Sequence, residues 1–162
     1  MTLTASQIGA LKVAAAAPDQ PQALLEAVAR IAIESLGCAL FTVMRFHEND
    51  MEVERLYSTN TATYPVGGRK AKRDTEWGRH VLTERQVLVG EGEAALRAAF
   101  DDHATIFGLG LRSMINVPVV YADTCLGTMN FSFRSEKVPA DAMATAMALA
   151  LIATPALSPD RR

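Results

Sequence analysis

Apolar and polar residues alternate along residues 108–133, and this alternation predicts a β-hairpin with two different faces. Its apolar row falls on odd positions: Ile115, Val117, Val119, Met129, Phe131 and Phe133. Its even positions are mostly polar, namely Arg112, Asn116, Thr128, Asn130 and Ser132, with Met114 and Leu126 among them. Successive strand side chains point to opposite faces, so a register with Asn116 opposite Asn130 aligns both rows. That register leaves residues 122–124 as the turn, and it predicts one dry face for a core and one polar face for a small polar molecule.

The rest of the chain is predicted to combine helices with short strands. Helices are expected at residues 3–17, 21–36, 77–84 and 91–101, and strands at 39–47, 51–58 and 87–89. Residues 60–75 are predicted to form a loop, and residues 102–110 to carry the chain into the hairpin. A last helix opens at Pro139 and Asp141 and must stop before Pro155, because proline disrupts a helix interior. The tail at residues 158–162 is predicted to be disordered.

This order of elements, together with one short motif, resembles a GAF domain. The motif is Arg112-Ser113 followed by Val117-Pro118, with Leu126-Gly127 opening the next strand. The resemblance covers residues 20–153. It implies an α/β (α+β) fold, in which an antiparallel sheet of about six strands is flanked by helices and carries a small-molecule pocket on one face. The expected organisation is an N-terminal helix at 1–18, the GAF-like domain at 20–153 and a C-terminal tail at 154–162.

Composition limits the classes of partner. The chain has 162 residues, within the usual range of a single domain, and a net charge of −2 gives no general reason to expect nucleic acid or an acidic membrane. The early apolar stretch is broken by Lys12 and followed by Pro18, so it does not match a secretory signal, and a cytoplasmic location is expected. Two cysteines, Cys38 and Cys125, are too few for a disulfide framework or a zinc site.

Several residues are candidates for the walls of the pocket. Four cations occur in residues 69–73; such a run is usually a solvated face, but one or two of them could reach the polar sheet face and bind a carboxylate or phosphate. Trp77 is either a core residue or a pocket wall. The opposed amides of Asn116 and Asn130 could satisfy each other or face a ligand. The full candidate set is Arg69, Arg73, Trp77, His80, Phe107, Arg112, Met114, Asn116, Thr128, Asn130 and Ser132.

The last helix is apolar on every side from Ala142 to Ala153, apart from Thr145. It is too short to span a membrane. A helix of this kind is either a core helix with a partly apolar surface or one that packs on the sheet and on a second subunit. We expect the second arrangement, a homodimer through the terminal helices. Two-fold dimers are the commonest assembly, and the resemblance to GAF domains implies pairing through terminal helices.

Catalytic patterns are harder to find. One GAF-like family reduces free methionine sulfoxide with cysteines in its pocket loops, but residues 60–110 contain no cysteine, and the odd position of Cys125 predicts the apolar face. The three histidines have no metal-ligand spacing. No catalytic residue, metal or cofactor is therefore predicted. A ligand-sensing module is the preferred function; an enzyme with unrecognised residues and a dimerisation module with a vestigial pocket are the alternatives.

Overall fold

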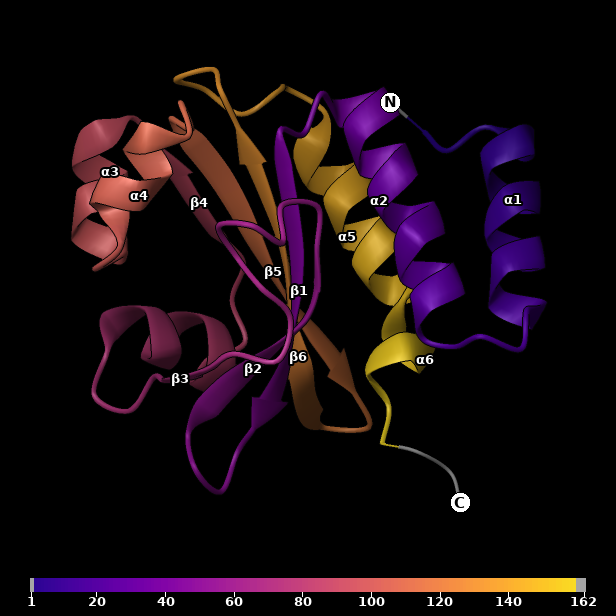
Figure 1. Ribbon diagram of the computed structural model, residues 1–162, viewed down its shortest axis with the longest axis horizontal. Coiled ribbons are helices and arrows are strands. Elements are labelled where there is room, and N and C mark those ends of the chain that lie inside the picture. The colour runs from indigo at the N-terminus through magenta and orange to yellow at the C-terminus, as the bar shows by residue number, and fades with distance from the viewer. Residues whose placement is uncertain (1, 160–162) are drawn as a thin grey trace.

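A six-stranded antiparallel sheet lies between two layers of helices in the computed structural model, which describes residues 2–159 (Figure 1). The strand order is β3-β2-β1-β6-β5-β4. This architecture confirms the predicted α+β fold. The elements along the chain are α1 (Ala5–Ala16), α2 (Gln22–Leu36), β1 (Leu40–His47), β2 (Glu52–Ser58), β3 (Arg69–Ala71), η1 (Gly78–Thr83), β4 (Leu88–Glu91), α3 (Glu93–Ala99), α4 (His103–Gly108), β5 (Ser113–Tyr121), β6 (Thr124–Phe133), α5 (Ala142–Ile152) and α6 (Thr154–Leu157).

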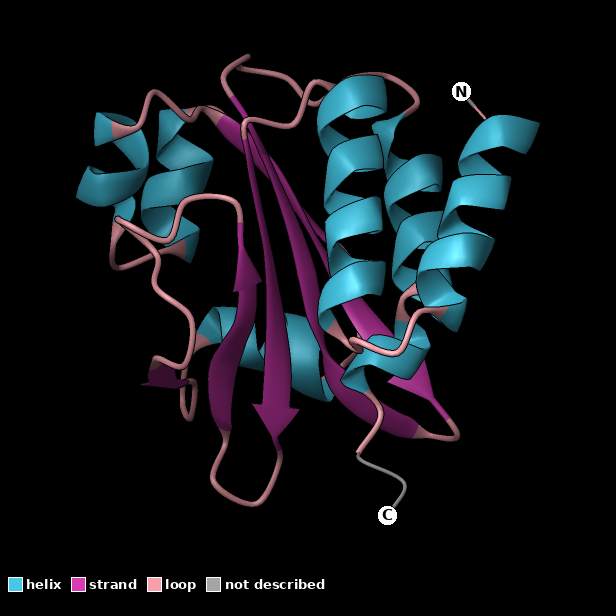
Figure 2. Ribbon diagram, turned by 45° about the vertical axis from the view of Figure 1, so that its right-hand side comes forward, coloured by secondary structure: helices cyan, strands magenta, loops and turns pink. Residues whose placement is uncertain are grey.

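One face of the sheet is covered by α2, α5 and α6, and α1 packs outside α2 (Figures 1 and 2). The odd row of the hairpin packs there as predicted, with Ile115, Met129 and Phe131 fully buried. The buried apolar side chains of α2 pack against this row. The helix ends at Gly37, whose left-handed φ of 67° suits glycine. This side forms the main hydrophobic core.

The hairpin register is the predicted one at its centre, where Asn116 pairs with Asn130, but it changes near the turn. Val119 pairs with Gly127 whereas Val120 pairs with Cys125, so β6 contains a bulge. The turn is therefore Ala122-Asp123, two residues with positive φ, and not the three residues predicted. An extra residue reverses the faces beyond the bulge. Leu126 accordingly packs against the helix-side core and Cys125 packs on the opposite side with Trp77, so the parity argument was wrong for both.

Three further segments differ from the sequence prediction. The expected loop contains the edge strand β3, which pairs with β2. Residues 102–110 include the short helix α4 instead of a plain connection. Residues after α5 return to the core as α6, whose Leu157 is buried, because Pro155 lies in the first turn of this new helix, where no N–H partner is lost. Ser158 caps α6, and residues 160–162 of the predicted tail lie outside the described residues.

The other face of the sheet is covered by η1, α3 and α4 (Figure 2). The predicted helix at 77–84 is present as η1, one turn of π-helix that packs against β5 and β6. These three short helices cover the face less completely than α2 and α5 cover theirs, and the candidate site lies between them. Within residues 2–159, no helix combines the length and apolar character needed to cross a bilayer.

Candidate functional site

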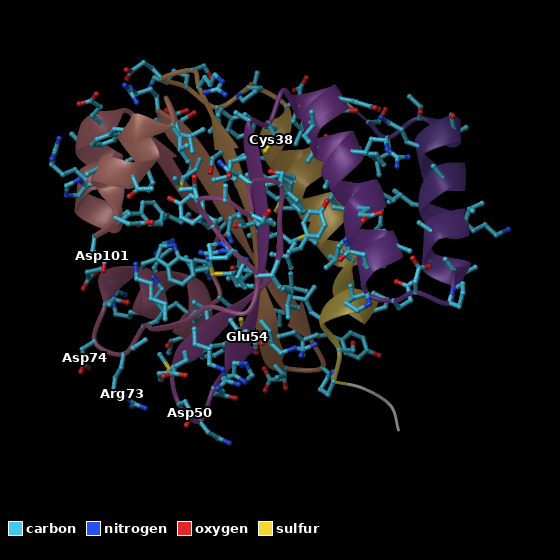
Figure 3. The ribbon with its side chains drawn as sticks, in the orientation of Figure 1. Cys38, Asp50, Glu54, Arg73, Asp74 and Asp101 are labelled. Carbon is cyan, nitrogen blue, oxygen red and sulfur yellow. The ribbon has the colours of Figure 1, made fainter. Side chains whose placement is uncertain are left out.

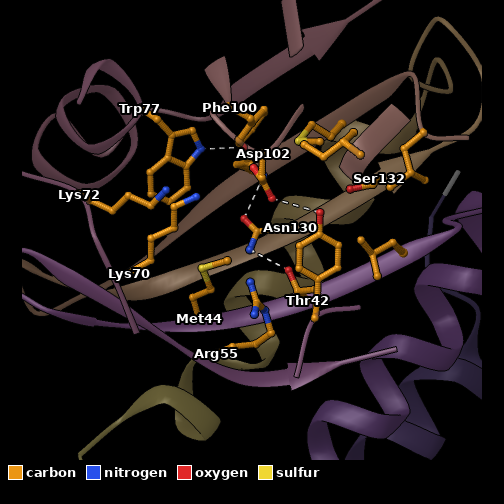
Figure 4. Close-up of a pocket in the computed structure, with 16 residues that line it drawn as sticks. Thr42, Met44, Arg55, Lys70, Lys72, Trp77, Phe100, Asp102, Asn130 and Ser132 are labelled. Carbon is orange, nitrogen blue, oxygen red and sulfur yellow. Dashed lines mark hydrogen bonds between the residues drawn. The ribbon is translucent and has the colours of Figure 1, made fainter. Parts of the chain in front are cut away.

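A cavity of about 80 Å³ lies on the polar face of the sheet, and its lining includes Trp77 just before η1 and Ile106 of α4 (Figure 4). Even positions of β1, β5 and β6 form its floor, as the alternation of strand side chains requires. Its walls come from residues 55–77 and 100–111. The lining residues are Leu40, Thr42, Met44, Arg55, Tyr64, Lys70, Lys72, Trp77, Phe100, Asp102, Ile106, Leu111, Met114, Asn116, Asn130 and Ser132.

A chain of hydrogen bonds runs across the floor (Figure 4). The indole Nε1 of Trp77 donates to Oδ1 of Asn116 at 2.9 Å, and Nδ2 of Asn116 donates to Oδ1 of Asn130 at 2.9 Å. Nδ2 of Asn130 then donates to the Thr42 hydroxyl at 3.1 Å. The two amides thus satisfy each other, which confirms the first of the two alternatives, and both also line the cavity. This series of hydrogen bonds fixes the Trp77 ring as a wall of the cavity.

Three cationic side chains and one carboxylate line the cavity. Arg55 lies on β2, and its guanidinium carbon is 4.9 Å from the centre of the Tyr64 ring. Its buried Nε has no hydrogen-bond partner among residues 2–159. Lys70 lies on β3 and Lys72 directly after it. The carboxylate is Asp102, which accepts a hydrogen bond of 3.1 Å from the Tyr64 hydroxyl. A positive balance and an unpartnered guanidinium N–H favour an anionic guest.

Lys72 has an unusual environment for a lysine. Its Nζ lies 4.7 Å from the centre of the Trp77 ring and, among the described residues, has no carboxylate at ion-pair distance. Burial lowers the pKa of this ammonium group from 10.5 to about 8, and the charges of Lys70 and Arg55 act in the same direction, against Asp101 and Asp102. A bound anion would supply the charge partner that Lys72 lacks.

Two contacts tie the wall segments together across the mouth of the cavity. Lys70 Nζ donates to Asp101 Oδ1 at 2.5 Å, and the Tyr64 hydroxyl donates to neighbouring Asp102. Burial and the negative charge of Asp102 raise the pKa of Tyr64, so its hydroxyl remains a donor at neutral pH. Both acidic residues belong to the connection between α3 and α4, so these contacts hold that connection against the β2–β3 segment.

Five of the residues predicted from the sequence line this cavity: Trp77, Met114, Asn116, Asn130 and Ser132. Four of them are even positions of the hairpin, in the part of it that lies away from the bulge and the turn. Thr128 was expected beside them, but it lies nearer the turn on β6, where it is fully buried and its hydroxyl has no hydrogen-bond partner within the described part of the chain. The cavity does not extend to that end of the hairpin.

The other predicted residues do not line the cavity. Arg69 turns to β2, where it lies 3.6 Å from Glu52 and 3.7 Å from Glu54, and Arg73 is exposed and points outward (Figure 3). A strand places alternate side chains on opposite faces, so the basic run cannot act as one cluster. The remaining three contact other protein groups: His80 Nε2 lies 3.2 Å from the Val87 carbonyl oxygen, Phe107 stacks on His103, and Arg112 donates to the carbonyls of Phe107 and Leu111.

Sequence reasoning missed the residues that arrive from distant segments. Arg55, Tyr64 and Asp102 carry charge or a hydroxyl into the cavity, yet none belongs to a local motif. The alternation in β1 could have indicated Thr42 and Met44, because they are even positions beside a helix-facing row of Phe41 and Val43. Lys70 and Lys72 were part of the basic run, and only their position on and after β3 distinguishes them from Arg69 and Arg73.

Neither cysteine is placed for thiol chemistry in the cavity. Cys38 and Cys125 are both buried and free, in different hydrophobic clusters, and neither lines the cavity. Burial raises the pKa of Cys38 to about 11 and that of Cys125 as well, which disfavours the reactive thiolate. In the described part of the chain, no group of three His, Cys, Asp or Glu side chains could hold a metal ion.

The chain belongs to the GAF domain family, whose model matches residues 20–157. The fold resembles the GAF domain of a phosphoenolpyruvate-protein phosphotransferase from Coxiella burnetii, with a TM-score of 0.74, 18% identity and coverage of 93% of this chain and 92% of that one. The corresponding domain from Acinetobacter has a TM-score of 0.71 at 13% identity, over 96% and 94% of the chains. The phycocyanobilin-bound GAF domain of a cyanobacterial phytochrome has a TM-score of 0.68 and 16% identity, over 97% of this chain and 95% of that one. No curated protein sequence matches the chain significantly. GAF domains are small-molecule-binding sensor and regulatory domains, and this is the class that the family assigns.

Proposed function

We propose that this protein is a sensor module whose cavity binds a small polar, anionic metabolite. The observation that carries the proposal is the cavity itself, where Arg55, Lys70 and Lys72 converge above a floor of buried amides. Cations with an unfilled hydrogen-bonding capacity in a partly dry site bind carboxylates and phosphates well. The ligand would join β1, β2 and β6 to the connection between α3 and α4, and so bias how those segments pack.

The size of the cavity restricts the ligand. Pockets for drug-sized ligands usually enclose roughly 300–1,000 Å³, whereas this cavity has about 80 Å³. A compact organic acid with a few heavy atoms fits this space better than a large chromophore. The apolar wall of Leu40, Ile106 and Leu111 favours a ligand with a short carbon skeleton beside its anionic group.

Thermal-shift and calorimetric titrations test this proposal, because a ligand that binds only the folded state raises the melting temperature. Lactate should raise it and the matched neutral amide, lactamide, should not. Lys72→Met and Arg55→Met should weaken lactate binding by about tenfold, which is about 1.4 kcal/mol. Arg73→Met is the matched control, since Arg73 lies in the same basic segment but outside the cavity. Equal responses to lactate and lactamide, or an equal loss in Arg73→Met, would contradict an anion site.

We also propose a homodimer that forms through the terminal helices. Of the nine exposed large apolar side chains in the described residues, five lie on the helices α1, α2 and α5. They are Ile8 and Val13 on α1, Ile33 on α2, and Met147 and Leu151 on α5. Leu151 is 73% exposed, which is unfavourable for a leucine unless another surface covers it. The sensor is expected to act in the cytoplasm.

A further inference from the structure

The backbone of Lys72 is fixed at the edge of the cavity. Its N–H donates to the Met51 carbonyl at 2.8 Å, and its own carbonyl accepts from the Thr75 hydroxyl at 2.8 Å and the Thr75 N–H at 3.3 Å. Gly78, at the start of η1, packs on that carbonyl so closely that a Cβ at Gly78 would lie 2.4 Å from the Lys72 oxygen. The lysine is therefore held by both its neighbouring strand and the helix behind it.

The side chain of Lys72 is directed by Trp77 and not by a carboxylate (Figure 4). Trp77 is itself held by its hydrogen bond to Asn116, so the ring that supports the amine is rigid. The other lysine of the cavity differs, because Lys70 forms an ion pair with Asp101 at 2.5 Å. A lysine without an ion-pair partner in a pocket with two further cations is poorly suited to a purely structural role.

The same environment makes the Lys72 amine available for chemistry. Burial and the two nearby cations lower the pKa of Lys72 to about 8, so at neutral pH the uncharged, nucleophilic form of the amine is about 300-fold more populated than in an ordinary lysine. Lys70, in contrast, forms an ion pair with Asp101. The cavity thus holds one amine that can react and two cations that can bind an anion.

We propose that Lys72 forms a reversible imine with a small oxo acid, whose carboxylate is held by Arg55 and Lys70. This inference rests on the proposed function and narrows its ligand class to anions that carry a carbonyl group next to the acid. Such a molecule combines the two features that the lining offers to bind, and it is small enough for the cavity.

The reaction needs no further reagent. The lone pair of Lys72 Nζ attacks the carbonyl carbon as the C=O π bond breaks, and a proton moves from nitrogen to oxygen to give a carbinolamine. The hydroxyl then leaves as water after protonation, and the C=N bond forms, so that amine and carbonyl yield imine and one water. Asp102 lies in the same cavity and is the carboxylate that can relay this proton.

Borohydride trapping with glyoxylate and with pyruvate tests the inference. Hydride reduces the imine to a stable secondary amine, so the intact protein gains the mass of the oxo acid less one oxygen atom. Peptide mapping should place the adduct on Lys72, with about tenfold more modification there than on the exposed Lys12 of α1. Lys72→Arg keeps the charge and should lose the adduct, whereas Lys12→Arg, which lies outside the cavity, should keep it.

The two proposals fail in different ways. If lactate binds to the unmodified protein and to Lys72→Arg, but no adduct forms on Lys72 with either oxo acid, the imine is refuted and the anion site stands. Adducts spread equally over Lys12, Lys70 and Lys72 would also refute it. If neither lactate nor the oxo acids bind, both proposals fall.

Discussion

The two faces of the sheet bury side chains of opposite character. On the face beneath α2 and α5, the strands contribute Phe41, Ile115, Met129 and Phe131, all fully buried and all apolar. On the face beneath η1 and α4, the same strands bury Thr42, Asn116, Asn130 and Ser132. Polar groups are costly to bury, so their concentration on one face leaves the other face as the main source of hydrophobic stabilisation. The side beneath α2 and α5 supplies hydrophobic free energy of folding. Part of this free energy offsets the cost of burying amides and cations on the cavity side.

Truncating the dry face should have the largest effect on stability. Phe131→Ala removes a fully buried ring and should lower the free energy of unfolding by about 3–5 kcal/mol. Met114→Ala on the cavity wall should cost less, about 2 kcal/mol, because it enlarges a space that already exists. Urea unfolding of both variants measures the difference. Equal losses would show that the two faces do not differ as sources of stability.

Removing the buried ammonium group from the cavity side should stabilise the protein. Lys72→Met should raise the free energy of unfolding at pH 7 by up to about 3 kcal/mol, because the folded pKa of about 8 lies below the ordinary 10.5. Between these two values the unfolded chain binds more protons than the folded one. The unmodified protein should therefore gain stability as pH rises from 8 to 10.5, and Lys72→Met should lose that dependence.

Denaturant unfolding at several pH values checks this prediction, with Lys70→Met as the matched control. Lys70 is half exposed and paired with Asp101, so its removal should change stability by no more than about 1 kcal/mol. A destabilised Lys72→Met would mean that the contact with Trp77 outweighs the cost of burying the charge.

Interrupting the amide chain should have an intermediate effect. Asn130→Ala leaves Nδ2 of Asn116 without its acceptor and the Thr42 hydroxyl without its donor, so a loss of about 1–3 kcal/mol is expected. Lactate binding should weaken more than this loss of stability alone explains, because Trp77 loses the fixed position of its partner Asn116. Calorimetry on Asn130→Ala and Asn116→Ala measures the two effects separately, and unchanged affinity in both would remove the amides from the binding site.

The outward face of α5 should have the smallest effect on the stability of a single chain. Leu151→Glu replaces an exposed side chain, so the free energy of unfolding of the single chain should change by no more than about 0.5 kcal/mol. The proposed dimer should dissociate. Light scattering at micromolar concentration measures the mass. Val66→Glu is the control, since Val66 is 56% exposed and belongs to the loop between β2 and β3, not to α1, α2 or α5. An unmodified protein that is already monomeric would refute the dimer.

Local patterns predicted most of the architecture because the strand period is short and strict. The alternation around Asn116 and Asn130 was sufficient to predict the register, the dry face and the amide pair on the polar face. The same argument failed beyond Gly127, where one bulge residue exchanged the faces of Cys125 and Leu126. The alternation of apolar and polar residues does not indicate such a bulge, since Cys125 and Leu126 can each be accommodated on either face of the sheet.

The sequence by itself determined most of the elements, the central register of the hairpin and the presence of a polar sheet face, because these depend on residues that are neighbours along one strand or helix. Only the tertiary structure decided which cations enter the cavity. Arg55, Lys72 and Asp102 meet there from three separate segments. Arg69 and Arg73, which look equivalent to Lys72 in the sequence, are directed elsewhere by the pairing of β3 with β2. Contacts between distant segments follow from packing, and a local pattern does not encode them.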